Sequence, residues 1–359
     1  MTRKSVVIIG GGYAGVELAK AIEAHLDVQL VEPREAFVHA PAMIRSLLDP
    51  KLLETALIPY DRLLTQGRFV ADRARSVDAT GAKLASGECL KADYVVVATG
   101  SSNGGAFKPE GDDIASFRAA QEALHTKILA ANRIVVVGAG PVGTELAGEI
   151  AHALPKEAVT LVAADEKLFP YLPHRVGASL LKKLEHMGVE VILGTRADLL
   201  STIEPSAGTL QLSNGRTLHA DLIIPAIGAK PQVRLLEELP GATFGKGGRI
   251  AVDPYLRPST IPNLFALGDA VDAGDAATIV AISRQQPWLA KTLKALAAGK
   301  TLESIEKYAS WKSAPMLVPL GPRRGSSFLV VGTFGDWVTR TMKGSDLFVP
   351  KYRKLFNQP

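Results

Sequence analysis

The sequence predicts an α/β fold that contains two Rossmann-like dinucleotide-binding units. Short apolar runs at residues 6–9 and 134–137 lead into glycine-rich turns at 10–15 and 138–143, and a helical pattern follows each turn. An acidic residue, Glu32, ends the second expected strand of the first unit. The chain of 359 residues is long enough for about two to three domains.

The composition is that of an ordinary globular protein, with 47% hydrophobic and 21% charged residues. No apolar run reaches about 18 residues, the length that a transmembrane helix needs, and the first apolar stretch is too short for a secretory signal. We therefore expect a cytoplasmic protein. The single cysteine, Cys89, excludes an intrachain disulfide and a CxxC redox pair.

The first glycine-rich turn, Gly10-Gly11-Gly12-Tyr13-Ala14-Gly15, has the spacing of a dinucleotide-binding loop. In such a loop the first glycine permits a tight turn, the second lets the backbone approach a pyrophosphate, and the third lets helix and strand pack closely. The N-terminus of the following helix stabilises the negative phosphates. Glu32 lies 17 residues after Gly15, where an acid accepts hydrogen bonds from ribose hydroxyls.

The segment after Glu32 combines an aromatic residue, a histidine and an arginine: Phe37, His39 and Arg45. It could pass beside a ring system or be a solvated connection. Residues 68–97 are expected to form short strands, the last of which ends in Ala98-Thr99-Gly100. Such small residues leave backbone amides free near a bound dinucleotide, so we place a cofactor in this half of the chain.

The second unit repeats the first. Its turn at 138–143 lies between an expected strand at 134–137 and an expected helix at 144–153. After the next strand, Ala163 occupies the position that Glu32 has in the first unit, so the ribose-binding acid is missing. Because this acid both holds the ribose 2′-hydroxyl and repels a 2′-phosphate, the choice between NADH and NADPH stays open.

The last strand of the second unit is also followed by small residues, as in the first unit. An expected strand at 222–224 leads into residues 225–228, which echo the small residues after the corresponding strand of the first unit. Farther on, a strand at 263–267 leads into Gly268-Asp269, and a helix is expected at about 276–298. Asp269 could bind a cofactor or merely cap that helix.

In order and spacing, these motifs resemble those of the two-dinucleotide flavoprotein reductases of the glutathione-reductase structural class over about residues 5–290. The resemblance implies FAD in the first unit, NADH or NADPH in the second, and Asp269 at the ribityl chain or diphosphate of FAD. The residues expected to bind FAD are Gly10, Gly12, Tyr13, Ala14, Gly15, Glu32, Arg34, Arg45, Val70, Ala98, Thr99, Gly100, Gly268 and Asp269. Those expected to bind NAD(P)H are Gly138, Gly140, Pro141, Val142, Gly143, Ala163, Ile227 and Gly228, and no metal site is expected.

The C-terminal stretch indicates a more specific resemblance within this class. Residues 342–349, MKGSDLFV, resemble the terminal Lys-x-x-Asp-Leu-Phe-Val signature of the apoptosis-inducing-factor-related family, which includes ferroptosis suppressor protein and is related to type II NADH:quinone oxidoreductases. By position, Lys343 matches a functional lysine near the flavin, and Phe348 matches an aromatic residue near the quinone and flavin. Glu145 matches a functional glutamate that would orient the nicotinamide amide, although a carboxylate early in a helix could merely complement the helix dipole.

The resemblance also implies a glutathione-reductase-like flavoprotein fold with a small C-terminal α+β domain. Residues 1–109 and 231–300 would form a discontinuous FAD-binding domain, and residues 110–230 would form the NAD(P)H-binding domain. Residues 301–359 would form the C-terminal domain, which covers the flavin and quinone site.

The activity implied is an FAD-dependent oxidoreductase that passes hydride from NAD(P)H to flavin and then two electrons to a quinone of the ubiquinone, menaquinone or vitamin K type. The quinol would serve as an antioxidant or as a respiratory carrier. Two alternatives remain. One is an NAD(P)H-dependent reductase of the ferredoxin or rubredoxin type, and the other is a redox-switched binding protein like apoptosis-inducing factor.

The basic excess lies at the C-terminal end, where residues 321–359 hold seven Lys/Arg and two Asp/Glu and so account for the whole net charge of +5. Residues 348–356 interleave aromatic and basic side chains, with Trp337 upstream, a pattern that favours peripheral contact with a membrane surface. A solvated tail, or one packed on its own domain, is the alternative, and nucleic-acid binding is a weaker one. Because residue 2 is Thr2, we expect no N-myristoylation. The sequence leaves open whether the protein forms a homodimer.

Overall fold

The computed structural model describes residues 3–103, 105–198 and 204–359. The first unit is built on a five-stranded sheet of order β19-β9-β1-β2-β5, in which all neighbouring strands are parallel. Helix α1 (Tyr13–Ile22) connects β1 to β2. The strands are β1 (Ser5–Ile9), β2 (Asp27–Val31), β5 (Arg68–Val70), β9 (Tyr94–Val97) and β19 (Leu264–Ala266). Because β19 comes from much later in the chain, the sheet is completed only after the second unit.

The second unit is built on a six-stranded sheet of order β13-β12-β11-β16-β15-β14. Its β11 lies between β12 and β16, as β1 lies between β2 and β9, and these pairings are parallel in both sheets. The predicted α/β fold with two Rossmann-like units is therefore confirmed. The strands are β11 (Arg133–Val137), β12 (Ala158–Val162), β13 (Glu190–Ile192), β14 (Ala197–Asp198), β15 (Ser206–Leu212) and β16 (Thr217–Pro225).

The two connections between the units run side by side as the antiparallel pair β10 (Ser101–Ser102) and β17 (Lys230–Pro231). The remaining short strands are β3 (Ala36–Val38) with β4 (Leu57–Pro59), β6 (Ala74–Asp78) with β7 (Gly81–Leu84) and β8 (Cys89–Lys91), and β18 (Ile250–Ala251) with β20 (Val271–Asp272). The helices are α2 (Ala40–Arg45), α3 (Pro50–Ala56), α4 (Ile114–Ala130), α5 (Pro141–Ala153), α6 (His174–His186), α7 (Arg234–Glu237), α8 (Ile279–Ala297), α9 (Asp336–Thr339) and α10 (Val349–Leu355). Single helical turns are η1 (Tyr60–Arg62), η2 (Lys246–Gly248), η3 (Leu302–Ser304) and η4 (Arg340–Gly344).

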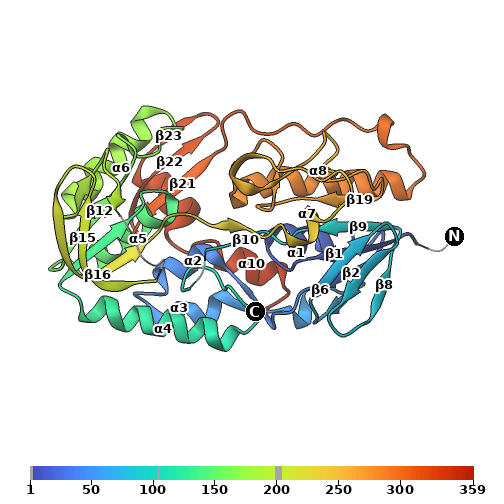
Figure 1. Ribbon diagram of the computed structural model, residues 1–359, viewed down its shortest axis with the longest axis horizontal. Helices are drawn as coiled ribbons and strands as arrows, with labels where there is room; N and C mark the ends of the chain where they lie inside the picture. The colour runs from blue at the N-terminus through green and yellow to red at the C-terminus, as the bar shows by residue number, and fades with distance from the viewer. Residues whose placement is uncertain (1–2, 104, 199–203) are drawn as a thin grey trace.

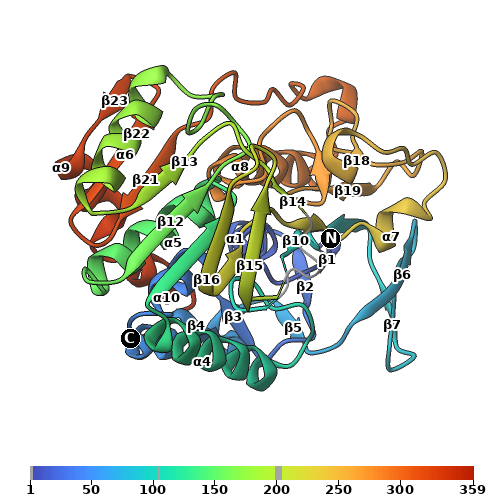
Figure 2. The same cartoon turned by 60° about the vertical axis from the view of Figure 1, so that its left-hand side comes forward.

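The C-terminal strands form an antiparallel sheet, β21 (Met316–Leu320), β22 (Arg324–Leu329) and β23 (Gly332–Phe334), which lies beside α5 and α6 (Figures 1 and 2). Val318 and Leu320 share one apolar core with Leu146 and Ile150 of α5. A side-chain carbon at Gly148 would lie 2.8 Å from the Cα of Leu320, so only glycine permits this approach of helix and strand. The division of the chain into three domains stays a prediction, because this sheet has its core in common with the second unit.

Helix α10 packs against the first unit (Figure 1). Tyr352 and Phe356 are 1% and 0% exposed, and their rings lie 5.6 Å and 5.1 Å from that of Phe37. The Tyr352 hydroxyl donates to Glu17 Oε1 at 2.7 Å. The expectation that the tail presents its aromatic residues to a membrane is wrong for these two, since both belong to the core. Within the described ranges, none of the helices is long and apolar enough to cross a bilayer.

The buried position of Phe356 predicts a large effect on stability. We expect Phe356→Ala to lower the free energy of unfolding by about 3 to 5 kcal/mol, because it removes a fully buried aromatic ring. Lys354→Ala, an exposed change on the same helix, is the control and should have little effect. Urea unfolding followed by circular dichroism measures both. Equal unfolding curves for the two variants would contradict the packing of α10.

Candidate cofactor-binding and active site

The two glycine-rich turns have the same geometry at the carboxyl ends of β1 and β11. A side-chain carbon at Gly15 would lie 1.8 Å from the carbonyl oxygen of Gly10. In the second turn, one at Gly143 would lie 1.8 Å from that of Gly138. Gly10 and Gly138 also have positive φ angles of 109° and 106°, which glycine adopts without strain. These four glycines are therefore required by the packing of each helix on its strand.

The middle glycines have a different environment. Gly12 and Gly140 precede the first residues of α1 and α5, and nothing lies within 4 Å of a side-chain carbon placed at either position. The protein's own packing does not require glycine there, whereas a pyrophosphate approaching the backbone at a helix N-terminus does. The turns therefore fit two dinucleotides. The other expected residues of the turns begin the two helices: Tyr13 and Ala14 in α1, and Pro141 and Val142 in α5.

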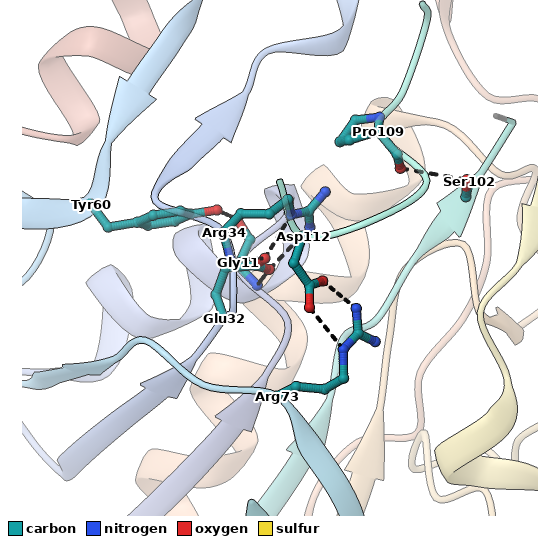
Figure 3. A network of polar contacts seen from close by, with 8 residues as sticks. All are labelled: Gly11, Glu32, Arg34, Tyr60, Arg73, Ser102, Pro109 and Asp112. Carbon is teal, nitrogen blue, oxygen red and sulfur yellow. Dashed lines mark hydrogen bonds and ion pairs between the residues drawn. The ribbon is translucent and has the colours of Figure 1, made fainter. Parts of the chain in front are cut away.

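Glu32 is buried at the carboxyl end of β2, next to the first turn (Figure 3). Its carboxylate accepts hydrogen bonds from Gly11 N at 2.7 Å and from Arg34 Nε and Nη2 at 2.6 Å and 3.0 Å. The Tyr60 hydroxyl donates to Gly11 O at 2.6 Å. Burial would lower the pKa of Arg34, but the Glu32 carboxylate outweighs it and raises that pKa above its ordinary value. Glu32 therefore holds the turn in place. A hydrogen bond between its carboxylate and a ribose hydroxyl stays a prediction.

Asp269 does not cap α8. That helix begins after Thr278, whose hydroxyl accepts a hydrogen bond from a backbone N–H of the first turn at 3.2 Å. The Asp269 carboxylate instead accepts from Ser101 Oγ at 2.7 Å and from Lys108 Nζ at 3.2 Å. The helix-cap alternative is thus wrong. Ser101 and Lys108 were not predicted from the sequence, because no motif marks them.

Lys108 follows β10 in the chain, in a connection that contacts its neighbours at Pro109 and Asp112. Figure 3 shows these two contacts. Ser102 Oγ donates to Pro109 O at 3.5 Å, and Arg73 Nε donates to Asp112 Oδ2 at 3.0 Å. Pro109 and Asp112 both follow Lys108, so these contacts hold the connection just after the residue whose ammonium group lies beside the carboxylate expected to bind FAD.

The other expected cofactor-binding residues lie at strand ends. Thr99 and Gly100 follow β9, and Ile227 and Gly228 follow the equivalent strand β16. In α/β sheets ligands bind at the carboxyl ends of parallel strands, so these positions suit cofactor binding. Their contacts with FAD and NAD(P)H stay predictions. Gly268 follows the end of β19 with a positive φ angle. Three further expected positions are buried at the ends of β5, β9 and β12: Val70, Ala98 and Ala163.

The structure brings together Lys343 and Glu145, two of the three expected catalytic residues. Lys343 Nζ donates to Glu145 Oε1 at 2.6 Å and to Leu317 O at 3.2 Å. The lysine and glutamate side chains are only 13% and 5% exposed. Burial raises the pKa of Glu145, and the ammonium group of Lys343 opposes that rise. Glu145 therefore has a specific cation as its partner, which the helix-dipole alternative does not require.

One helical turn farther along α5, Glu149 forms a second buried ion pair. Arg45 Nε and Nη2 donate to Glu149 Oε1 at 3.0 Å and 2.8 Å. Arg45 Nη1 donates to the carbonyl oxygen of Gly344 at 2.7 Å. Arg45 was expected at FAD. Glu149 was not predicted, although its spacing of four residues from Glu145 places both acids on one helix face. A contact between Arg45 and FAD stays a prediction.

Comparison with known proteins identifies the family of the chain. Residues 4–299 match the model of the pyridine nucleotide-disulphide oxidoreductase family. The chain belongs to this family. It is 30% identical to apoptosis-inducing factor homolog B of Dictyostelium discoideum, over 99% of this chain and 98% of that protein. It is 27% identical to ferroptosis suppressor protein 1 of Xenopus laevis, over 98% of this chain and 96% of that protein. The structure of NDH2 from Plasmodium falciparum in complex with NADH is similar with a TM-score of 0.74 at 14% identity, and the match covers 99% of each chain.

The expected resemblance to apoptosis-inducing factor and ferroptosis suppressor protein is therefore confirmed, as is the flavoprotein fold. The protein is an oxidoreductase of this family, and the family implies FAD and NAD(P)H as cofactors. A disulfide reductase carries a redox pair of cysteines. This chain belongs to the pyridine nucleotide-disulphide oxidoreductase family but has a single cysteine, Cys89, which is exposed.

Phe348, the third expected catalytic residue, immediately precedes α10 in this oxidoreductase and is half-buried. Phe348 and Leu347 both have positive φ angles, of 64° and 53°. The carbonyl oxygen of Leu347 lies 2.6 Å from Nε2 of the fully buried His39. Because a carbonyl only accepts, the neutral His39 ring carries its proton on Nε2, and Nδ1 accepts from the Tyr13 hydroxyl at 3.0 Å. His39 is thus a core residue that fixes the backbone beside Phe348.

The middle glycines predict two selective losses. We expect Gly12→Ala to weaken FAD binding and Gly140→Ala to weaken NAD(P)H binding, each by about tenfold or more, because the added methyl group occupies space that a phosphate needs. Thermal unfolding of the flavin-free proteins should change little, since that space is open. Flavin content and the half-saturating NADH concentration measure the losses, and each variant controls for the other. Loss of both cofactors in one variant would contradict separate sites.

The burial of His39 predicts an acid-sensitive fold. Burial lowers the pKa of His39 to about 4, whereas an unfolded histidine has a pKa near 6.5. Its contribution to stability is complete above about pH 6.5 and is lost as the pH falls towards 4, so the free energy of unfolding should fall by about 2 kcal/mol between pH 7 and pH 5. Urea titrations at both pH values test this. A His39→Gln variant should lack this part of the decrease, and equal decreases in both proteins would refute the assignment.

Proposed function

We propose that this protein is an NAD(P)H:quinone oxidoreductase that uses FAD. The observation that carries the proposal is the buried contact of Lys343 with Glu145, because it joins the C-terminal segment to the helix behind the second dinucleotide turn. Bound FAD would supply the redox chemistry, taking up hydride from NAD(P)H and releasing two electrons to a quinone. With one proton from solvent, the hydride balances the two electrons and two protons that a quinol contains.

Glu145 suits the electron-donor side of this reaction. It lies in the second helical turn of α5, which begins at the turn expected to bind NAD(P)H. A buried carboxylate there can accept a hydrogen bond from the nicotinamide amide and so orient the ring. NADH is the better-supported donor, because the similar Plasmodium falciparum structure was solved in complex with NADH. NADPH stays a candidate, since Ala163 has no carboxylate to repel a 2′-phosphate.

Lys343 suits the electron-acceptor side. An ammonium group stabilises negative charge that develops on an acceptor oxygen and can donate a proton to it. Burial strengthens this interaction, because little water screens the charge. Phe348, five residues farther along, would supply an apolar surface for a quinone ring. Lys343 would regain its proton from solvent, through the small part of its side chain that is exposed.

Contact with a membrane remains part of the proposal, through the expected Trp337 and the exposed Val331 but not through Tyr352 and Phe356. Tyr352 and Phe356 are buried, whereas Val331 and Trp337 in the same C-terminal region are 83% and 74% exposed. Their apolar side chains, with the basic excess of residues 321–359, would favour peripheral contact of a cytoplasmic protein with an anionic lipid surface.

The proposal predicts the effect of removing Lys343. We expect Lys343→Ala to retain FAD but to reduce quinone about a hundredfold more slowly, the usual loss when a group that stabilises developing charge is removed. Lys354→Ala, which removes an exposed charge nearby, is the control. The measurement is anaerobic bleaching of the flavin by NADH and by NADPH, followed by reoxidation with ubiquinone, menaquinone and ferredoxin in parallel.

The same traces separate the alternatives. Rapid reoxidation by ferredoxin and not by quinones would instead support a ferredoxin-type reductase. Slow reoxidation by every acceptor, with a long-lived complex of flavin and nicotinamide, would support a redox-switched binding protein. Quinone reduction at the wild-type rate by Lys343→Ala would refute the role of that lysine.

A further inference from the structure

Two buried acids share one face of α5. Glu145 and Glu149 are four residues apart and both are buried, and like charges at this spacing repel each other even on an exposed helix. The arrangement is stable only because each acid has its own cation. Lys343 pairs with Glu145, and Arg45 pairs with Glu149.

The two ion pairs are also joined to each other. Arg45 donates to the carbonyl oxygen of Gly344, the residue directly after Lys343. The contacts therefore close a ring that runs from Glu145 through Lys343 and Gly344 to Arg45 and Glu149, and back along one turn of α5. This ring joins α2 of the first unit, α5 of the second unit and η4 of the C-terminal segment.

We propose that Glu149 is a positioning residue that keeps Lys343 paired with Glu145, because it supplies Arg45 with a carboxylate of its own. The inference rests on the roles proposed above for Lys343 and Glu145. Without the Glu149 carboxylate, the nearest acid on the same helix face is Glu145. Arg45, whose permanently charged side chain is only 12% exposed, then competes with Lys343 for Glu145 and displaces its ammonium group.

The first test measures the position of Lys343 without any catalysis. In Glu149→Gln holoenzyme we expect Lys343 to be acetylated by a limiting amine-reactive reagent about tenfold faster than in the wild type, because its ammonium group loses its partner. Peptide mass spectrometry gives the rate, and the exposed Lys354 in the same digest is the internal reference. An unchanged Lys343 rate relative to Lys354 would overturn the proposal.

A second test separates positioning from a general loss of stability. If Glu149 acts through Lys343, Glu149→Gln lowers the rate of reoxidation per bound flavin in the wild-type background but adds no further loss in Lys343→Ala. Glu190→Gln is the matched control, because it removes a carboxylate from an exposed ion pair of the same unit. It should change neither background. A lower melting temperature or flavin content with an unchanged rate per bound flavin would show that Glu149 is structural only.

The outcomes distinguish this inference from the proposed function. If the wild type reduces no quinone, the proposed function fails, while acetylation of Lys343 still tests the position of its ammonium group. If quinone is reduced and Glu149→Gln changes neither acetylation nor rate, the positioning role alone fails. In the Glu149→Gln background, Arg45→Met removes the competing cation, so it should return the acetylation rate of Lys343 to the wild-type value. A rate that stays high in this double variant would overturn the competition between Arg45 and Lys343.

Discussion

Both units depend on one steric constraint, the close approach of each third glycine to the carbonyl oxygen of the first. At Gly15 and at Gly143 a side-chain carbon would lie 1.8 Å from that oxygen. The constraint makes α1 and α5 begin directly behind β1 and β11, so that each helix N-terminus lies at the carboxyl ends of parallel strands. Two equivalent anion-binding positions follow from one local geometry that occurs twice.

The two copies differ in where they place acidic side chains. The first unit has Glu32 at the end of β2, tied to its own turn through Gly11 and Arg34. The second unit has Ala163 at that position but places Glu145 and Glu149 in the buried face of α5. The first unit thus uses its acid to hold its own glycine-rich turn, whereas the acids of the second unit join other parts of the chain to α5.

Much of this was predictable because it depends on local sequence. The glycine spacings, the buried strands and the position of Glu32 are properties of short segments, and the structure has them where they were expected. The resemblance indicated Lys343 and Glu145 as separate functional residues, but their pairing was not predicted, because residues so far apart have no local pattern in common. Lys108, Ser101 and Glu149 were missed for the same reason: only the folded chain brings their partners close. The expectation that the aromatic residues of the tail face a membrane was wrong for Tyr352 and Phe356. The alternation of aromatic and basic residues at 348–356 suits both a membrane surface and the apolar core that these two side chains enter.

Buried ion pairs seldom repay the cost of removing charges from water, so stability alone is a poor reason to keep four charges at one junction. Arg45, Glu145, Glu149 and Lys343 nevertheless form two complete pairs that come from three distant segments. No segment can satisfy its charges by itself. A misplaced C-terminal segment would leave Glu145 without its cation and Arg45 without the carbonyl oxygen to which it donates. The electrostatic penalty is therefore smallest only when the first unit, α5 and η4 have docked together. The charges that would serve electron transfer are thus the ones that make the reacting site assemble in a single arrangement.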